Sequence, residues 1–344
     1  MGQKAEFIKE KGGFSMKMKR VASLLLLSLM FGIFIIGVSV AQAQDEDRFK
    51  VNLSIGALAL FRQGNDSIPL VTDSFAPGGG ITVVNANNLD LGIAPGLDAS
   101  VSGRYRMFGL EFRYFGLNQW SRDQGPSGSA GGAVVQYQIP IGNIAVPNIV
   151  NAEYESTIHN IEANVRWWPI DRLSILAGFR YLMLNEDLTI EQDIGPGLNF
   201  GKHKIETENT LIGGQVGVEG IPLLFKDAFF RGDELSFGVW AKGGYFNNHI
   251  KTDITIMQAI APVFVAGANK SDNNGTFVGE GALKVGYKFT RNVGIDLRYQ
   301  VLWIQNAGLA PEQVGASNPA FGMASTKTQS VIYHGPWAGV VLTF

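Results

Sequence analysis

The sequence has no cysteine, little charge and no excess of either sign, and each shortage excludes a class of protein. Without cysteine the chain can form neither a disulfide framework nor a thiolate metal site. A net charge of −2 offers no basic surplus to neutralise phosphates, so we expect no nucleic-acid partner. Charged residues make up 17% of the chain, glycine accounts for 43 residues and the mean hydropathy is +0.09, a balance typical of strands facing something less polar than water.

Long hydrophobic runs are also scarce, because the chain has one, from Val21 to Val40, and none after it. Basic residues precede this run and the A-x-A site of residues 41–43 follows it, which is the pattern of a cleaved signal peptide read by the export translocon. About 20 apolar residues can also cross a bilayer as a helix, so an uncleaved anchor is the alternative. We therefore predict an N-terminal extension and signal peptide over 1–43 and a separate domain over 44–344.

Beyond this segment the dominant pattern is alternation of apolar and polar residues, the period of a β-strand with two different faces. Ile161, Ala163, Val165 and Trp167, for example, alternate with polar or charged residues. The same alternation predicts ten strands, over residues 49–61, 97–106, 108–118, 154–168, 173–186, 205–219, 234–247, 276–289, 293–304 and 329–344.

The connections between these predicted strands alternate in length. All but one of the short ones have the length of tight hairpin turns, and 220–233 is the exception. Such alternation around an even number of strands is typical of a bacterial outer-membrane barrel. We predict an all-β fold, a transmembrane antiparallel up-and-down β-barrel of about ten strands; residues 133–139, AVVQYQI, could add a hairpin arm and make twelve. The expected external loops are 62–96, 119–153, 187–204, 248–275 and 305–328.

The last stretch, WAGVVLTF, alternates to the end of the chain and predicts a strand that pairs with the first, because lipid does not tolerate an open sheet edge. It resembles the C-terminal insertion signal of bacterial outer-membrane proteins, with Gly339, Leu342 and Phe344 at the glycine and hydrophobic positions. Trp337 stands where that pattern prefers a polar residue. The resemblance implies outer-membrane lipid and the outer-membrane barrel assembly machinery as partners.

Residues 154–188 resemble the central hairpin of the β-barrel porin family of bacterial outer-membrane proteins, most of which have no assigned activity. This resemblance implies a barrel in the bacterial outer membrane, and it implies less about any transported solute.

Charged residues on the predicted inward faces are the candidate site. They could pair across strands and fill the lumen, since barrels of about eight strands are filled by side chains, or they could line a narrow, slightly anion-selective pore. The candidate pore-lining residues are Arg104, Arg106, Glu111, Arg113, Glu162, Arg166, Arg180, Lys242, Glu280, Lys284, Asp296 and Arg298, and the same faces carry Asp98, Glu219 and Lys288.

Three functions are consistent with this sequence. The first is a narrow passive pore for ions or small solutes, and the second is a structural or adhesive barrel with a plugged lumen that acts through its external loops. The third is a protease, since His249 and Asp187 fall toward the same side of a barrel that resembles the omptin proteases in strand number and size. No omptin motif, metal-ligand spacing or cofactor-binding motif occurs, so we expect neither enzyme activity nor a cofactor or metal.

Overall fold

The computed structural model of the chain describes residues 49–63, 68–73, 81–89, 91–117, 119–129, 133–135, 148–193, 199–258 and 264–344. The expected signal peptide over 1–43 lies outside these residues.

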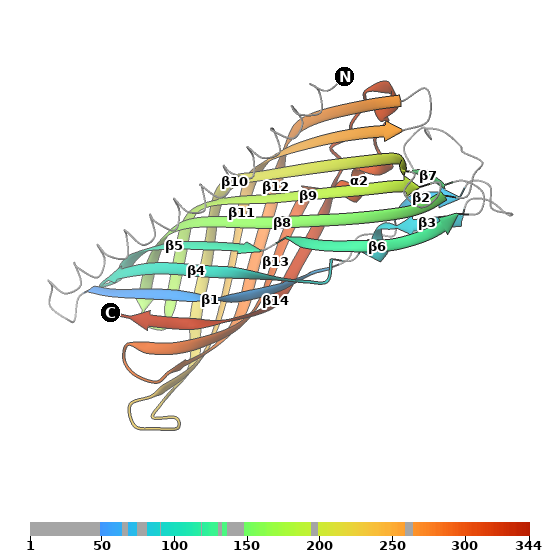
Figure 1. The fold of residues 1–344 in the computed structure, drawn as a ribbon. Coiled ribbons are helices and arrows are strands. Elements are labelled where there is room, and N and C mark those ends of the chain that lie inside the picture. The colour runs from blue at the N-terminus through green and yellow to red at the C-terminus, as the bar shows by residue number, and fades with distance from the viewer. Residues whose placement is uncertain are drawn as a thin grey trace, which may run out of the picture.

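The described strands close into one antiparallel ring (Figure 1). Each strand pairs with its neighbours in the order β5-β4-β1-β14-β13-β12-β11-β10-β9-β8, and β5 then pairs with β8. A further strand, β6 (Trp120–Ser129), continues β5 along the same edge of β8. The predicted ten-stranded barrel is therefore confirmed. Its strands are β1 (Phe49–Gln63), β4 (Ile93–Tyr105), β5 (Phe108–Leu117), β8 (Asn148–Ile170), β9 (Leu173–Asp193), β10 (Asn199–Lys226), β11 (Glu234–Gln258), β12 (Phe264–Lys288), β13 (Val293–Gly308) and β14 (Thr328–Thr343).

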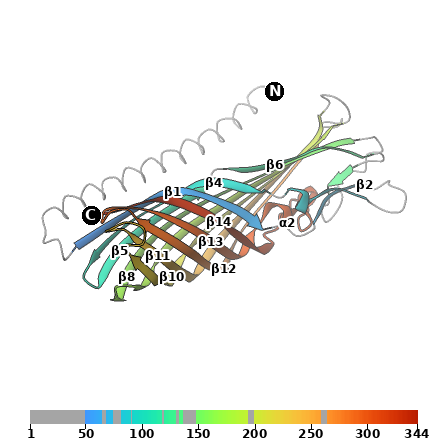
Figure 2. The same ribbon diagram turned by 90° about the horizontal axis from the view of Figure 1, so that it is seen from below.

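The two ends of the barrel differ. At one end, called the turn end, short connections join neighbouring strands: 106–107, 171–172, 227–233 and 289–292. At the other, the loop end, lie the remaining elements, in both views of the barrel (Figures 1 and 2). These elements are β2 (Pro69–Asp73), β3 (Ile81–Asn85), the 3-10 helix η1 (Ala86–Leu89), β7 (Ala133–Val135), the helix α2 (Ala310–Val314) and the 3-10 helix η2 (Pro319–Phe321).

A second, three-stranded sheet at the loop end consists of β3, β2 and β7. Val71 of β2 pairs with Val135 of β7, so residues 133–135 add nothing to the ring. The twelve-stranded alternative is not realised there, and residues 136–139 lie outside the described part of the chain.

The outward face of the long strands changes polarity part-way along the barrel. Outward residues of β9 are apolar or aromatic from Ile175 to Met183 and polar from Asn185 onward. In β10 the outward residues are polar as far as Thr210 and apolar from Ile212. Thr210 pairs with Met183, so the change falls at one level on both strands. The apolar level is the band that faces lipid, and the strands beyond it stand in water.

The inward face changes in the opposite sense. Within the apolar band the buried inward residues of β9 include Ser174 and Arg180, whereas toward the loop end they include Leu184, Leu188 and Ile190. The charged interior thus lies at the level of the lipid-facing band, whereas toward the loop end apolar side chains join the buried polar ones, such as Glu186 and His203, and form a hydrophobic core there.

Aromatic side chains mark both edges of the outward apolar band. These side chains point outward from the barrel, where aromatic girdles of membrane barrels occur. They are Tyr105, Phe108, Trp167 and Phe289 toward the turn end, and Tyr181, Tyr245, Phe277 and Trp303 toward the loop end.

The reversal in polarity corrects two of the expected loops. The segments 187–204 and 248–275 are mostly strand, since β9 and β10 are separated only by residues 194–198 and β11 and β12 only by 259–263. The connection expected at 220–233 also shortens to 227–233, because β10 continues beyond an irregularity between Gly220 and Leu223.

The ring closes between β1 and β14. Gly56 and Gly339 are directly paired across this seam, and a Cβ on Gly56 would lie 2.6 Å from the ring of Trp337. The two glycines therefore leave the space that the inward-pointing indole occupies. At the end of the seam Phe344 and Val51 exchange backbone hydrogen bonds of 2.8 and 3.0 Å, and Leu342 pairs with Leu53.

Leu283→Arg should destabilise the barrel by about 2–4 kcal/mol, because Leu283 is an outward residue midway between Phe277 and Phe289 and is 68% exposed to the surroundings of the band. Ser271→Arg is the matched control, since Ser271 lies on the same face of β12 beyond the apolar band. Unfolding in lipid vesicles by denaturant measures both variants. Equal tolerance of the two changes would contradict the assigned position of the band.

Candidate functional site: a filled lumen and a turn-end cavity

The middle of the lumen is filled by charged side chains from six strands, here called the central ion layer. Three cations face three anions, and none of these side chains is more than 4% exposed. Buried charges of this kind are tolerated only when they are paired and hydrogen-bonded. The central ion layer consists of Asp98, Arg113, Glu162, Arg180, Lys242 and Glu280.

Arg113 connects the carboxylates of this layer. Its guanidinium lies 2.7 Å from Asp98 Oδ2, 2.7 Å from Glu280 Oε1 and 3.3 Å from Glu162 Oε1. It also donates a 3.2 Å hydrogen bond to Gln300 Oε1. One guanidinium thus ties together residues from five strands of the wall.

Glu162 is the corresponding anionic hub. Its Oε2 accepts hydrogen bonds from Lys242 Nζ at 2.7 Å and from Gln215 Nε2 at 2.8 Å. Arg180 lies 3.4 Å from Oε1 of the same carboxylate and makes a close ion pair with Glu280. The layer is therefore a connected network across the lumen.

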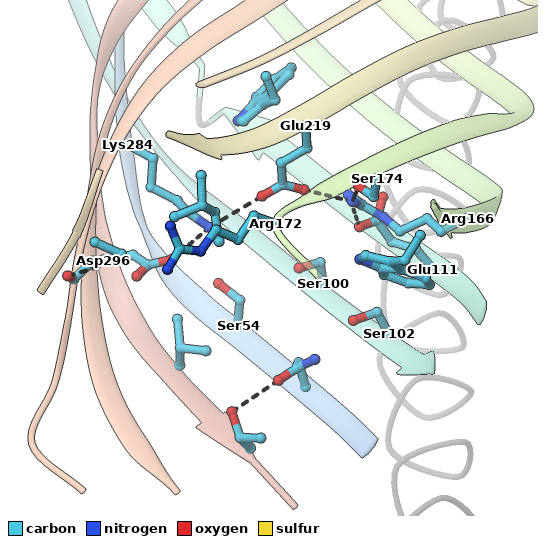
Figure 3. A pocket seen from close by; sticks show the side chains of 18 of the residues that line it. Ser54, Ser100, Ser102, Glu111, Arg166, Arg172, Ser174, Glu219, Lys284 and Asp296 are labelled. Carbon is cyan, nitrogen blue, oxygen red and sulfur yellow. Dashed lines mark hydrogen bonds and ion pairs between the residues drawn. The ribbon is translucent and has the colours of Figure 1, made fainter. Parts of the chain in front are cut away.

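Below the layer, toward the turn end, lies a cavity of about 280 Å³ with a second group of charges. Arg166 donates to Glu111 at 2.5 Å and to Glu219 at 2.6 Å, and Lys284 contacts the other oxygen of Glu219 at 3.2 Å. Figure 3 shows Glu219 between Arg166 and Lys284. Serine hydroxyls line the facing wall of the cavity, from Ser54, Ser100 and Ser102 (Figure 3).

Above the layer, toward the loop end, the lumen is closed by an apolar core and by the connection between β13 and β14. This connection, residues 309–327, is here called the plug segment. Leu309, Ala310 and Val314 are buried in the apolar core. The plug segment was expected to be an external loop within 305–328, and it instead turns into the barrel because its apolar residues find an apolar interior there.

Two polar contacts hold this region to the wall. Arg62 of β1 pairs with Glu186 of β9 at 2.9 Å, and the second oxygen of Glu186 accepts the amide hydrogen of Ala310 at 2.9 Å. Asn209 of β10 accepts from the Gly308 amide at 2.7 Å and donates to the Gly308 carbonyl at 2.8 Å. The second contact imitates a backbone pairing and fixes where the chain leaves β13.

Not all of the expected pore-lining residues lie in the lumen. Arg104 pairs with Asp171 at 2.7 Å at the turn end. Arg106 is exposed in the turn after β4, with a φ of 54°, and so lies outside the lumen although its position in the alternation placed it inside. Lys288 lines the cavity at its turn-end rim, where it is 44% exposed and 3.8 Å from Glu234. The others expected there occupy the central ion layer or line the cavity: Glu111, Arg113, Glu162, Arg166, Arg180, Lys242, Glu280, Lys284, Asp296 and Arg298.

The residues considered for a protease do not form a catalytic group. His249 faces outward on β11, with Nδ1 3.0 Å from Asn273 Oδ1, while Asp187 faces outward on β9 and pairs with Lys204 at 2.7 Å. The strand β10 lies between them. Within the described ranges no group of three His, Asp or Glu side chains could hold a metal ion, and no helix is long and apolar enough to span a membrane.

No known protein family matches the chain, and no curated protein matches its sequence. Solved structures with a similar fold include the outer-membrane protease OmpT of Escherichia coli, at 10% identity and a TM-score of 0.43 over 87% of this chain and 97% of that one. A FadL homologue of Pseudomonas aeruginosa gives 10% identity and a TM-score of 0.31 over 87% and 90%. The attachment invasion locus protein Ail of Yersinia pestis gives 9% and 0.25 over 86% and 99%. These similarities concern the barrel fold alone.

Glu162→Gln should lower the free energy of unfolding by about 3–5 kcal/mol, since it leaves the cations around it buried without their shared anion. Asp253→Asn is the control, because it breaks an ion pair with Lys251 whose partners are 38% and 50% exposed, and it should cost about 1 kcal/mol or less. Denaturant unfolding in detergent compares them. Similar losses for both variants would refute a tightly coupled central ion layer.

Acid should lower the free energy of unfolding through His203, an inward residue of β10 that lies beyond the apolar band, toward the loop end. Burial lowers the pKa of His203 from 6.5 to about 4. The unfolded chain takes up this proton near pH 6.5 and the folded chain does so only near pH 4, so stability is full above pH 6.5 and falls as the pH drops through that window, by up to about 3 kcal/mol. His203→Gln should reduce this acid-dependent loss in unfolding measurements between pH 7 and pH 4. An unchanged pH profile would exclude His203 as its source.

Proposed function

We propose that the protein is an outer-membrane barrel with a closed lumen that acts through the part of its wall standing above the membrane. The observation that carries this proposal is the central ion layer, whose six side chains pair with one another and are at most 4% exposed. A conducting pore needs water beside its charges, and here each carboxylate of the layer contacts a cation directly. The geometry favours the plugged barrel over the narrow pore.

A second closure supports the same function. The plug segment and the apolar core fill the loop end, so the lumen is occupied at two separate levels. The outer wall is accessible on the loop side. There β9, β10 and β11 present polar and charged side chains of both signs, including Asp187, Lys204, Glu206 and Lys251. A wall of this kind is suited to contact with another surface or a protein partner.

The location and the assembly partners belong to the same proposal. The apolar band with aromatic edges supports insertion in the bacterial outer membrane. Export through the translocon with cleavage after the 1–43 segment, and insertion by the barrel assembly machinery through Gly339, Leu342 and Phe344, remain the route that the sequence predicts.

Single-channel recording tests the proposal. The full chain, folded and inserted into a planar bilayer, should show no discrete conductance in symmetric salt at moderate voltage. Vesicle insertion is verified in parallel by protease protection of the membrane band. A stable conductance from correctly folded wild-type protein would overturn the closed-lumen function and return the narrow pore to first place.

A plug deletion separates the two closures. Replacing residues 310–326 by a short Gly-Ser linker should leave the barrel electrically silent, because the central ion layer still fills the lumen. Conductance that appears only in the deletion variant would make the plug segment the sole barrier and would contradict the role given to the central ion layer.

A further inference from the structure

One lysine and one arginine side chain lie opposite each other on neighbouring strands of the turn-end cavity. Lys284 of β12 and Arg298 of β13 are paired in register, and both line the cavity. Like charges directly opposite each other on a sheet destabilise it unless something neutralises them. This pair therefore requires an anion near both side chains.

The carboxylates of the protein neutralise these two cations only partly. Asp296 is the carboxylate that both side chains share, and the same oxygen lies 3.8 Å from Lys284 Nζ and 3.9 Å from Arg298 Nη2. Asp98 also acts on Arg298 electrostatically, but Arg113 already binds Asp98 at 2.7 Å. Ion pairs elsewhere in the lumen, such as Arg166 with Glu111 at 2.5 Å, are far closer. Glu219 helps Lys284 at 3.2 Å, but it is already bound by Arg166 at 2.6 Å.

Arg298 keeps hydrogen-bonding capacity that the described residues do not use. Its side chain is 11% exposed, its Nη2 donates to Ser54 Oγ at 2.9 Å, and its Nε has no hydrogen-bond partner among the described residues. The face of the guanidinium lies over the Trp337 ring at 3.7 Å, which holds it in position. Nε itself is buried, and the exposed part of the guanidinium faces the cavity that Arg298 lines, where a ligand can accept hydrogen bonds from it.

The surroundings suit a small, hydrogen-bonding anion. Hydroxyl groups of Ser54 and Ser100 and the amide of Asn52 line the same cavity, and its volume of about 280 Å³ accommodates a small oxyanion. The region around Lys284 and the facing serine wall are visible in Figure 3.

From these observations we infer that the turn-end cavity binds a small oxyanion, a phosphate or carboxylate group, between Lys284 and Arg298. The anion accepts hydrogen bonds from the two cations and from the serine hydroxyls, and it completes the pairing that Asp296 provides only at long range. This site is separate from the central ion layer and exists whether or not the lumen conducts.

Calorimetric titration of inorganic phosphate into the full chain, folded in a non-ionic detergent at constant ionic strength, tests the inference. Saturable binding to one site is expected. Arg298→Gln and Lys284→Gln should each weaken it by about tenfold or more, the scale of one charge-assisted hydrogen bond. Lys251→Gln is the matched control, since it removes the same charge from the outer wall, where Lys251 is 50% exposed and outside the cavity lining, and it should change the affinity by about twofold or less.

Asp296→Asn gives a change of opposite sign. Removing the competing carboxylate should tighten phosphate binding, while β-sheet circular dichroism and heat-dependent gel migration verify that the variant is folded. Absence of saturable binding to the wild type overturns the inference. So does equal weakening by Lys251→Gln and Lys284→Gln, which would indicate general attraction to the positive charge of the protein, and so does a loss of affinity in a folded Asp296→Asn variant.

Discussion

Closure of the sheet into a ring of ten strands is the constraint on which the rest of the structure depends. Every backbone group within the lipid-facing band must be paired, so β14 has to return to β1 and leave no open edge. A ring of this size encloses too little space for a wide water-filled channel, and its inward side chains must satisfy one another. The balance of charges in the central ion layer follows from that limit, because an unpaired charge there would have neither water nor a partner.

The alternation of strand residues is used in two opposite ways along the same strands. Where lipid lies outside, the polar side chains of β9 point inward, and where water lies outside its leucines do so. Where water surrounds the wall, the hydrophobic effect favours apolar residues on the inward face, and the barrel acquires a hydrophobic core at the loop end in addition to its charged middle. The plug segment belongs to the second level, since Leu309, Ala310 and Val314 are buried in the apolar core there.

This reversal explains which parts of the fold the sequence could predict. Strand positions within the membrane band and the inward charges, such as Arg113 and Glu162, follow from a two-residue period with a single polarity. The loop-end halves of β9 to β12 could not be predicted in this way. There the outward residues are polar, so the sequence resembles a polar loop although the two-residue period continues. Arg106 shows the other weakness of periodicity: its position predicts an inward side chain, but the backbone has already entered the turn. The pairing partners of Glu162 depend on how strands are staggered and on which residues meet across the lumen, which no local pattern encodes.

Trp337 links the closure of the ring to the chemistry of the cavity. From the sequence it is an exception within the terminal pattern, but in the structure it points inward over the paired glycines of the β1–β14 seam. Its ring then supports the guanidinium of Arg298 from one face. An aromatic face holds a cation without supplying the hydrogen-bond acceptor that a carboxylate would supply. Trp337 therefore fills the seam and also holds the guanidinium of Arg298 in place without accepting a hydrogen bond from it. The strand pairing that closes the barrel thus favours binding of an anion beside Arg298.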